Sequence, residues 1–217
     1  MTGVRVAVVG AGATGSPIVW GLTQCDWVSQ IIVVDPDQIA LSNLPRQPWY
    51  YPEDVGRPKV VVLAERLAHP RIMGIHDAVD EDFTWPPVDV VIDATDNVKT
   101  RQDIEAWARR HQIPWIFSSA LRWEGQVAWM HPEGPCLRCL FGDDWLDGPR
   151  CFEAGVVSGV TLAVAGQVIG LLERWQHNPS DPDLSALWLI DGWESRVWSV
   201  RLGEGRCPHY AVGTYKR

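Results

Sequence analysis

The chain has 217 residues, which is enough for one sizeable α/β domain and short for two independent hydrophobic cores. Its formal net charge is −8 and no Lys/Arg run is longer than two, so nucleic acid is disfavoured as a partner. The apolar runs fall well short of the roughly 20 residues that cross a bilayer, and no signal peptide precedes the first strand. We therefore expect a cytoplasmic protein without a membrane partner.

Strands and helices alternate through the first two thirds of the chain. The hydrophobic pattern predicts buried strands at residues 4–9, 30–35, 88–94, 113–120 and 125–132. It predicts helices at residues 14–25, 58–70 and 100–112. This alternation is typical of a mostly parallel sheet with helices on both faces.

The amino-acid composition changes after residue 132. Residues 133–151 are rich in Gly, Pro, Asp and Cys without any period, and we expect a long loop there. Residues 159–175 form a nearly all-apolar helix, either buried on most sides or set in an oligomer interface, and residues 186–202 alternate like a hairpin. The predicted fold class is therefore α/β, a Rossmann-like, mostly parallel sheet with a C-terminal antiparallel extension.

A glycine-rich loop separates the first strand from the first helix. Gly10, Gly12 and Gly15 form G-x-G-x-x-G. Such a loop brings backbone N–H groups and a helix N-terminus up to a phosphate. The motif predicts a nucleotide without saying which one, and a packing turn with no ligand is the alternative.

Polar residues follow the second strand. Asp35 closes that strand and is expected to meet ribose hydroxyls. Asn43, Arg46 and Gln47 lie in the turn-rich segment behind it, and Lys59 begins the next helix. An Arg and a Lys converging on a phosphate loop favour a triphosphate, whereas solvated surface charges are the alternative.

A second acidic segment, "DATDN", follows the strand at residues 88–94. Asp93 ends this strand and Asp96 lies just beyond it. A carboxylate at that place can hold Mg²⁺ beside the β- and γ-phosphates, and we assign this role to Asp96. Asp93 and Asn97 are counted among the nucleotide-binding residues.

Together these motifs resemble the ThiF/MoeB/HesA family, the bacterial relatives of the ubiquitin-activating enzymes. The resemblance rests on S-N-L-x-R-Q at residues 42–47, D-x-T-D-N at 93–97 and C-x-E-A-G-V at 151–156. It extends over nearly the whole chain, since "GAGATGSPIVWGL" and "LIDGW" also match. It implies a single adenylation domain over residues 1–217, with a nucleotide-binding half at 1–132 and a crossover loop, buried helix and hairpin at 133–217.

The activity that the resemblance implies is adenylation of a carboxylate with ATP and Mg²⁺. The acceptor is the C-terminal carboxylate of a small ubiquitin-like or sulfur-carrier protein ending in Gly-Gly, and the enzyme is a homodimer. The residues expected to act in catalysis are Arg46, Lys59, Asp96 and Cys151. In-line displacement at phosphorus needs alignment and charge neutralisation rather than a strong base, and this residue set fits that demand.

The cysteines raise two further hypotheses. Cys151 sits where many family members carry a cysteine that can form a thioester or disulfide-linked intermediate, and a passive thiol is the alternative. Cys136 and Cys139 resemble half of the family's four-cysteine zinc clip. Cys207 and His209 complete a site of three thiolates and one imidazole if the tight C-x-H spacing closes a tetrahedron, and three thiols without metal are the alternative.

One feature of the family is not matched. Relatives carry an N-terminal helix with an arginine that reaches the partner protomer's ATP, whereas here the first strand begins at Val4.

Three rival functions remain as alternatives. They are activation of another group, either a peptide carboxylate in natural-product assembly or a modified tRNA base; a catalytically silent carrier-binding subunit; and a dinucleotide-dependent dehydrogenase. The last is disfavoured because S-N-L-P-R-Q has no role in hydride transfer.

Overall fold

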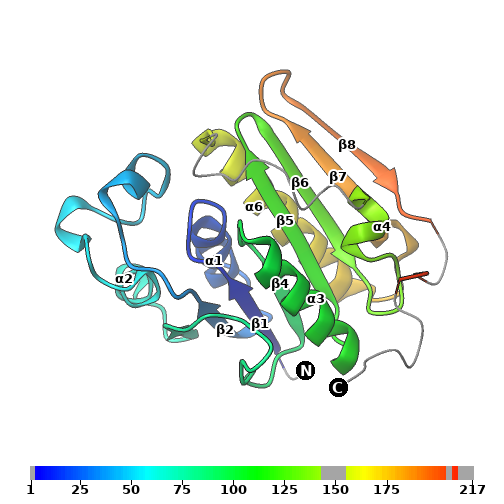
Figure 1. Ribbon diagram of the computed structural model, residues 1–217, viewed down its shortest axis with the longest axis horizontal. Helices are drawn as coiled ribbons and strands as arrows, with labels where there is room; N and C mark the ends of the chain where they lie inside the picture. Colours follow the sequence, from blue (N-terminus) through cyan, green and yellow to red (C-terminus); the bar gives the residue numbers. More distant parts are fainter. Residues whose placement is uncertain (1–2, 143–154, 204–206, 210–217) are drawn as a thin grey trace.

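The computed structural model describes residues 3–142, 155–203 and 207–209 (Figure 1). Its centre is one eight-stranded sheet in the order β3-β2-β1-β4-β5-β6-β7-β8. Five strands run parallel, namely β1 (Val4–Val9), β2 (Val28–Val34), β3 (Ile72–Ile75), β4 (Val90–Asp93) and β5 (Trp115–Leu121). The sheet continues antiparallel through β6 (Glu124–Met130), β7 (Ala186–Asp191) and β8 (Arg196–Arg201). The predicted α/β fold class is confirmed.

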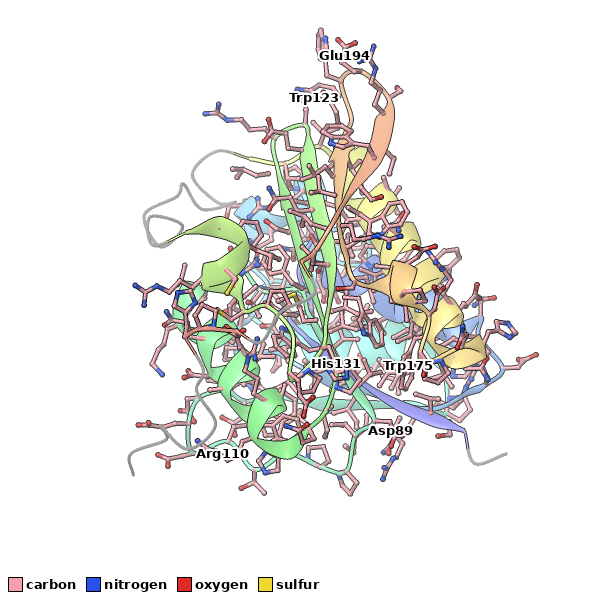
Figure 2. The ribbon with its side chains drawn as sticks, turned by 90° about the vertical axis from the view of Figure 1, so that its right-hand side faces the viewer. Asp89, Arg110, Trp123, His131, Trp175 and Glu194 are labelled. Carbon is pink, nitrogen blue, oxygen red and sulfur yellow. The ribbon has the colours of Figure 1, made fainter. Side chains whose placement is uncertain are left out.

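Helices cover both faces of this sheet. The α-helices are α1 (Gly15–Thr23), α2 (Lys59–Leu67), α3 (Val98–His111), α4 (Leu137–Phe141) and α6 (Ser158–His177). Short 3₁₀ turns lie at η1 (Leu41–Arg46), η2 (Pro52–Asp54) and η4 (Pro182–Leu184). Figure 2 shows α3 and α6 on opposite sides of the sheet. In the described part of the chain, no helix combines the length and the apolar character needed to cross a membrane.

The side chains of β1 divide the interior into two cores. Val6 and Val8 point into a core shared with α1, α2 and α6, whereas Ala7 and Val9 point into a core shared with α3 and α4. Successive residues of a strand point to opposite faces, and all four of these residues are buried. A central strand buried on both faces explains the continuous apolar run "VAVV" at residues 6–9.

The two antiparallel hairpins extend the sheet on one side. In Figure 2 their tips, marked by Trp123 and Glu194, lie together at one end, and His131 marks the other. The ring of Trp123 meets the ring of Trp193 edge to face at a centroid distance of 5.3 Å. The predicted terminal hairpin is thus confirmed, and it joins the main sheet through β6.

The structure contains two short elements that were not predicted from the sequence. The strand β3 was not predicted, because its four residues are too few for a periodic signal and Gly74 interrupts them where the chain approaches the Val60 carbonyl. The loop expected at 133–151 contains the helical turn α4 at its start. That turn has only five residues and is flanked by Pro135 and Gly142, so composition concealed it.

Packing explains two of the three loop glycines. Gly10 has a φ of +100°, and a Cβ there would lie 2.6 Å from the Ala94 carbonyl oxygen. A Cβ on Gly15 would lie 1.8 Å from the carbonyl oxygen of Gly10. A Cβ on Gly12, in contrast, would lie no nearer than 3.5 Å to Gln47 Nε2, which is an ordinary contact. The fold therefore requires Gly10 and Gly15, whereas Gly12 leaves space that the fold itself does not use.

We expect Gly15→Ala to lower the free energy of unfolding by about 2 kcal/mol or more, because the added methyl overlaps backbone that cannot move independently. Gly12→Ala is the matched variant and should unfold within about 0.5 kcal/mol of the wild type. Urea denaturation of both variants checks this contrast. Equal losses of stability in the two variants would contradict it.

Candidate nucleotide site and metal cluster

A cavity of about 640 Å³ opens where the parallel strands end. Nine of the residues singled out from the sequence line it, namely Gly10, Gly12, Asp35, Asn43, Arg46, Gln47, Lys59, Asp96 and Asn97. They come from the turns after β1, β2 and β4 and from the start of α2. Because the carboxyl ends of neighbouring parallel strands meet at one edge, segments far apart in sequence converge here.

The glycine loop forms the part of the cavity closest to α1. Gly12, Ala13 and Thr14 line the cavity, and α1 begins directly behind them at Gly15. The first N–H groups of a helix have no partner within the helix, and its N-terminus carries a partial positive charge. No acidic side chain occupies the first turn of α1. This end of the cavity is therefore suited to an anion such as phosphate.

Asp35 is held rigidly at the end of β2. Its two carboxylate oxygens accept hydrogen bonds from the backbone N–H groups of Ala11, at 2.6 Å, and Asp37, at 2.8 Å. The residue is only 4% exposed, and this burial raises the pKa of its carboxyl above the ordinary value. Each oxygen retains a lone pair, so the carboxylate can still accept hydrogen bonds from a diol such as the ribose hydroxyls.

Two cations predicted from the sequence lie in the cavity wall. The Lys59 ammonium lies 2.7 Å from Oδ2 of Asp37 and 3.9 Å from Oδ2 of Asp35. The Arg46 guanidinium donates to the carbonyl of Ser42 at 2.8 Å and is only half-buried. Lys59 is therefore fixed, whereas Arg46 lies at the rim.

The amides of the η1 segment differ in their bonding. Asn43 accepts a hydrogen bond from the N–H of Ala40 at 3.1 Å and stabilises the turn. Gln47 is buried, and its Oε1 has no hydrogen-bond partner among the described residues. A buried acceptor without a partner is costly, so this atom at the cavity wall is suited to a donor from a ligand.

Two aromatic residues that sequence reasoning missed attach the η1 segment to the glycine loop. The Tyr50 hydroxyl donates to the carbonyl of Ala11 at 2.7 Å, and Trp49 Nε1 donates to the carbonyl of Ser16 at 3.0 Å. Burial raises the pKa of the Tyr50 hydroxyl well above its ordinary value, so it remains a donor. These contacts fix Arg46 and Gln47 relative to the loop.

The two acidic residues of the "DATDN" turn differ in burial and in role. Asp93 is fully buried, and its Oδ1 accepts from both the N–H and the hydroxyl of Thr95 at 3.0 and 2.7 Å. It does not line the cavity, and burial raises the pKa of its carboxyl. Asp96 is exposed at the cavity, and Asn97 caps α3 by accepting from the N–H of Lys99 at 2.9 Å. The geometry therefore gives Asp93 a supporting position rather than a ligand position.

Arg101 is the principal cavity residue that sequence reasoning missed. It reaches back from α3 and donates to the carbonyls of Thr95 and Ser118, the latter at 3.2 Å. Its Nη1 lies 3.8 Å from Oδ2 of Asp93, and that oxygen has no hydrogen-bond partner among the described residues. The Arg101 guanidinium also lies 4.5 Å from the ring centre of Phe117. Arg101 itself lines the cavity, so it supports the turn that carries Asp96 and adds a positive charge to the wall.

The cysteine clip assembles at the start of α4, where Cys136 is the N-cap residue and Cys139 lies in the helix. The thiol sulfurs of Cys136, Cys139 and Cys207 and Nδ1 of His209 all lie within 4.8 Å of one another. The imidazole nitrogen lies 3.2, 3.4 and 3.9 Å from the three sulfurs, in chain order. Tetrahedral zinc with bonds of about 2.3 Å to sulfur separates its ligands by about 3.8 Å. The C-x-H spacing therefore does permit four ligand atoms to converge, and the donor set fits zinc.

Two buried residues of α3 hold the chain leading into the clip. The Arg109 guanidinium donates to the carbonyls of residues 132, 134 and 135 at 2.8, 3.0 and 2.9 Å. Glu105 pairs with Arg109 at 3.2 Å and accepts from the N–H of Leu137. Sequence reasoning missed this pair, because i and i+4 charges on a helix usually indicate a solvated face.

Cys151 lies outside the described residues. Two described residues close in sequence to residues 143–154, Phe141 before them and Val156 after them, line the cavity. Tyr210, which follows the clip histidine, is also outside the described part of the chain.

Fold and site together define a Rossmann-like nucleotide-binding protein with an added cysteine–histidine clip. The ThiF family model matches residues 1–209, and the chain belongs to the ThiF family. It is 32% identical to the sulfur carrier protein ThiS adenylyltransferase of Escherichia coli, over 95% of this chain and 80% of that protein. It is 37% identical to the sulfur carrier protein adenylyltransferase of Thermus thermophilus, over 76% of this chain and 65% of that protein.

Solved structures support the fold. The crystal structure of E. coli MccB with MccA-N7isoASN superposes with a TM-score of 0.79 over 93% of this chain and 65% of that chain. The sequences are 20% identical, so this likeness concerns the fold alone.

We expect Arg101→Met to lower the free energy of unfolding by about 3–5 kcal/mol, because it leaves the Asp93 carboxylate buried without a cation. Adding Asp93→Asn to that variant should recover part of the loss, since the amide keeps the Thr95 acceptor and removes the charge. Urea unfolding of both single variants and the double variant measures the coupling. Strictly additive losses would show that the two side chains do not act as a pair.

Proposed function

We propose that this protein is an adenylyltransferase that uses ATP to activate the C-terminal carboxylate of a small sulfur-carrier or ubiquitin-like protein. The observation that carries the proposal is the meeting, in one cavity, of the glycine loop, the ribose-suited Asp35, the cations Arg46, Lys59 and Arg101, and Asp96. Two ThiF-family relatives, the adenylyltransferases of sulfur carrier proteins from Thermus thermophilus and Escherichia coli, support the same reaction class.

In the proposed reaction, a carboxylate oxygen of the carrier attacks the α-phosphorus of ATP. The bond from that phosphorus to the oxygen bridging the α- and β-phosphates breaks, and pyrophosphate leaves with the bond electrons. An acyl-adenylate is formed, and no proton is transferred. The cavity residues therefore need only to align the two anions and to neutralise charge, which preorganised N–H groups and cations accomplish.

Asp96 is the residue that we propose for Mg²⁺. It is exposed at the cavity, and a carboxylate oxygen is the ligand that this ion prefers. The ion would neutralise phosphate oxygens as the pyrophosphate leaves. Cys151 remains our candidate for a covalent bond to the activated carrier, and the cavity residues Phe141 and Val156 flank its segment.

The wild-type protein should catalyse ATP–pyrophosphate exchange when a carrier ending in Gly-Gly is present, and Asp96→Ala should reduce the rate at least about 100-fold. The measurement is incorporation of labelled pyrophosphate into ATP. Thermal melting should leave Asp96→Ala within about 2 °C of the wild type, because the side chain is exposed and lies outside the buried Asp93–Arg101 pair.

Cys151→Ala separates the two chemical roles in the same assay. It should keep the exchange activity, since adenylation needs no thiol, and lose any thioester or disulfide link to the carrier. ATP binding without exchange for any carrier would instead indicate a silent carrier-binding subunit. Exchange driven by a short peptide but by no carrier would indicate activation of a peptide carboxylate.

We also propose that the clip of Cys136, Cys139, Cys207 and His209 binds one structural zinc ion. Burial raises the pKa of the Cys136 thiol to about 12, and a coordinated cation is what would hold such a thiol ionised. The clip joins the start of α4 to the segment after β8, so a bound ion would fix these two chain segments to each other. Reduced thiols of this kind accord with the cytoplasm as the proposed compartment.

Purified protein should contain about one zinc per chain, and His209→Ala should lower the metal content to well below half of that. Inductively coupled plasma mass spectrometry checks both values. His209→Cys is the matched variant and should retain zinc, because it supplies a fourth thiolate. Metal-free wild-type protein, after growth with zinc and without chelators, would contradict the proposal.

A homodimer is the assembly that we propose. The surface formed by α1 and α6 supports it, since Trp20 is 47% and Leu162 is 54% exposed there. The two helices pack closely where Gly21 meets Ile169, so these exposed apolar side chains lie on neighbouring helices.

A further inference from the structure

Asp37 is a cavity residue that neither the glycine motif nor the S-N-L-x-R-Q motif contains. Its Oδ2 lies 2.7 Å from the ammonium of Lys59, whose side chain is only 7% exposed. The Asp37 side chain is 64% exposed. Asp35 lies 3.9 Å from the same ammonium on its buried side, so one cation faces two carboxylates and the cluster carries a net charge of about −1.

The two carboxylates differ in their freedom to move. Asp35 is fixed by the N–H groups of Ala11 and Asp37. Among the described residues, the carboxylate of Asp37 has a hydrogen bond only to Lys59. An exposed side chain with one partner can leave it at a small cost, whereas a buried and doubly bonded one cannot.

The backbone connection between these residues does not depend on the side-chain pair. The N–H of Lys59 donates to the carbonyl of Asp37 at 3.0 Å, and Gln38 and Pro58 form an antiparallel bridge beside it. Removing the charge of Asp37 therefore leaves the start of α2 in place. What changes is the partner of the Lys59 ammonium.

We propose that Asp37 is a positioning residue that holds the Lys59 ammonium in the nucleotide-free cavity and releases it to the phosphate oxygens of ATP. The inference rests on the proposed function, since it requires that the cavity takes a polyphosphate. An entering polyphosphate meets a net negative cluster, and it gains Lys59 only when Asp37 turns outward to solvent. When pyrophosphate leaves, Asp37 pairs with Lys59 again and so favours release of the product.

The variant Asp37→Asn tests this, because it keeps the shape and removes the charge. Its dissociation constants for pyrophosphate and for ATP, measured by titration calorimetry, should fall about threefold to tenfold, and pyrophosphate should inhibit exchange correspondingly more strongly. Adenosine, which has no phosphate, should bind both proteins equally. Asp37→Glu restores a carboxylate and should return the constants toward the wild-type values.

The matched control is Asp183→Asn. Asp183 is an exposed carboxylate, 58% exposed, paired with Arg201 at 2.5 Å outside the cavity. The Asp183→Asn variant removes the same charge from the chain and should leave pyrophosphate binding unchanged. Asp37→Ser gives a second charge-removing variant if Asp37→Asn is poorly folded, and it should shift the constants in the same direction.

Unchanged or weaker polyphosphate binding in Asp37→Asn and Asp37→Ser, with the wild type binding ATP normally, would overturn the inference alone. A wild type that binds neither ATP nor pyrophosphate would overturn the proposed function, and this inference would fall with it. A role confined to folding would alter the melting temperature and leave the ratio of pyrophosphate to adenosine affinity unchanged.

Discussion

The cavity keeps its shape because two buried carboxylates terminate the strands on either side of β1. Asp35, directly after β2, accepts a hydrogen bond from the N–H of Ala11 in the glycine loop. Asp93, the last residue of β4, accepts hydrogen bonds from Thr95 and faces Arg101. The glycine loop leaves β1 between these two anchors, and the turn carrying Asp96 is held by the second. Together with the hydrogen bonds that Tyr50 and Trp49 donate to Ala11 and Ser16, these anchors hold the glycine loop and the turn that carries Asp96 in position.

These anchors are costly to the fold. Burial raises the pKa of both carboxyls, which means that the folded state binds a proton more tightly than the unfolded chain does. Their contribution to stability is therefore fully present below the pKa of the unfolded chain and is lost as the pH rises through the folded value. At neutral pH the two carboxylates lower the stability of the folded state, and the hydrophobic cores on both faces of the sheet must offset this loss. A buried charge retained at such a cost is better explained by what it positions than by stability.

The sequence alone was enough to predict the site residues that come directly after a buried strand. Asp35 and Asp96 were found because each follows a buried apolar run, and such runs converge at one edge of a parallel sheet. Arg101 escaped because its side chain reaches back from a helix, and no local pattern records that direction. The element β3 is too short to show a period, and α4 is hidden between Pro and Gly. The pairing of cavity charges likewise depends on side-chain conformations that become fixed only when the segments have met.

The helix α4 connects the cysteine–histidine clip to the wall of the cavity. Its N-cap is Cys136, Cys139 lies one turn further, and its last residue, Phe141, lines the cavity. The Phe141 ring lies 5.1 Å from that of Phe117, and Arg101 lies over Phe117 in turn. A five-residue helix is too short to be stable alone, so its position must come from its ends. One end is held by the cysteine–histidine cluster and by Glu105, and the other by the aromatic wall of the cavity. Whatever fixes the thiols therefore also fixes this aromatic wall of the cavity.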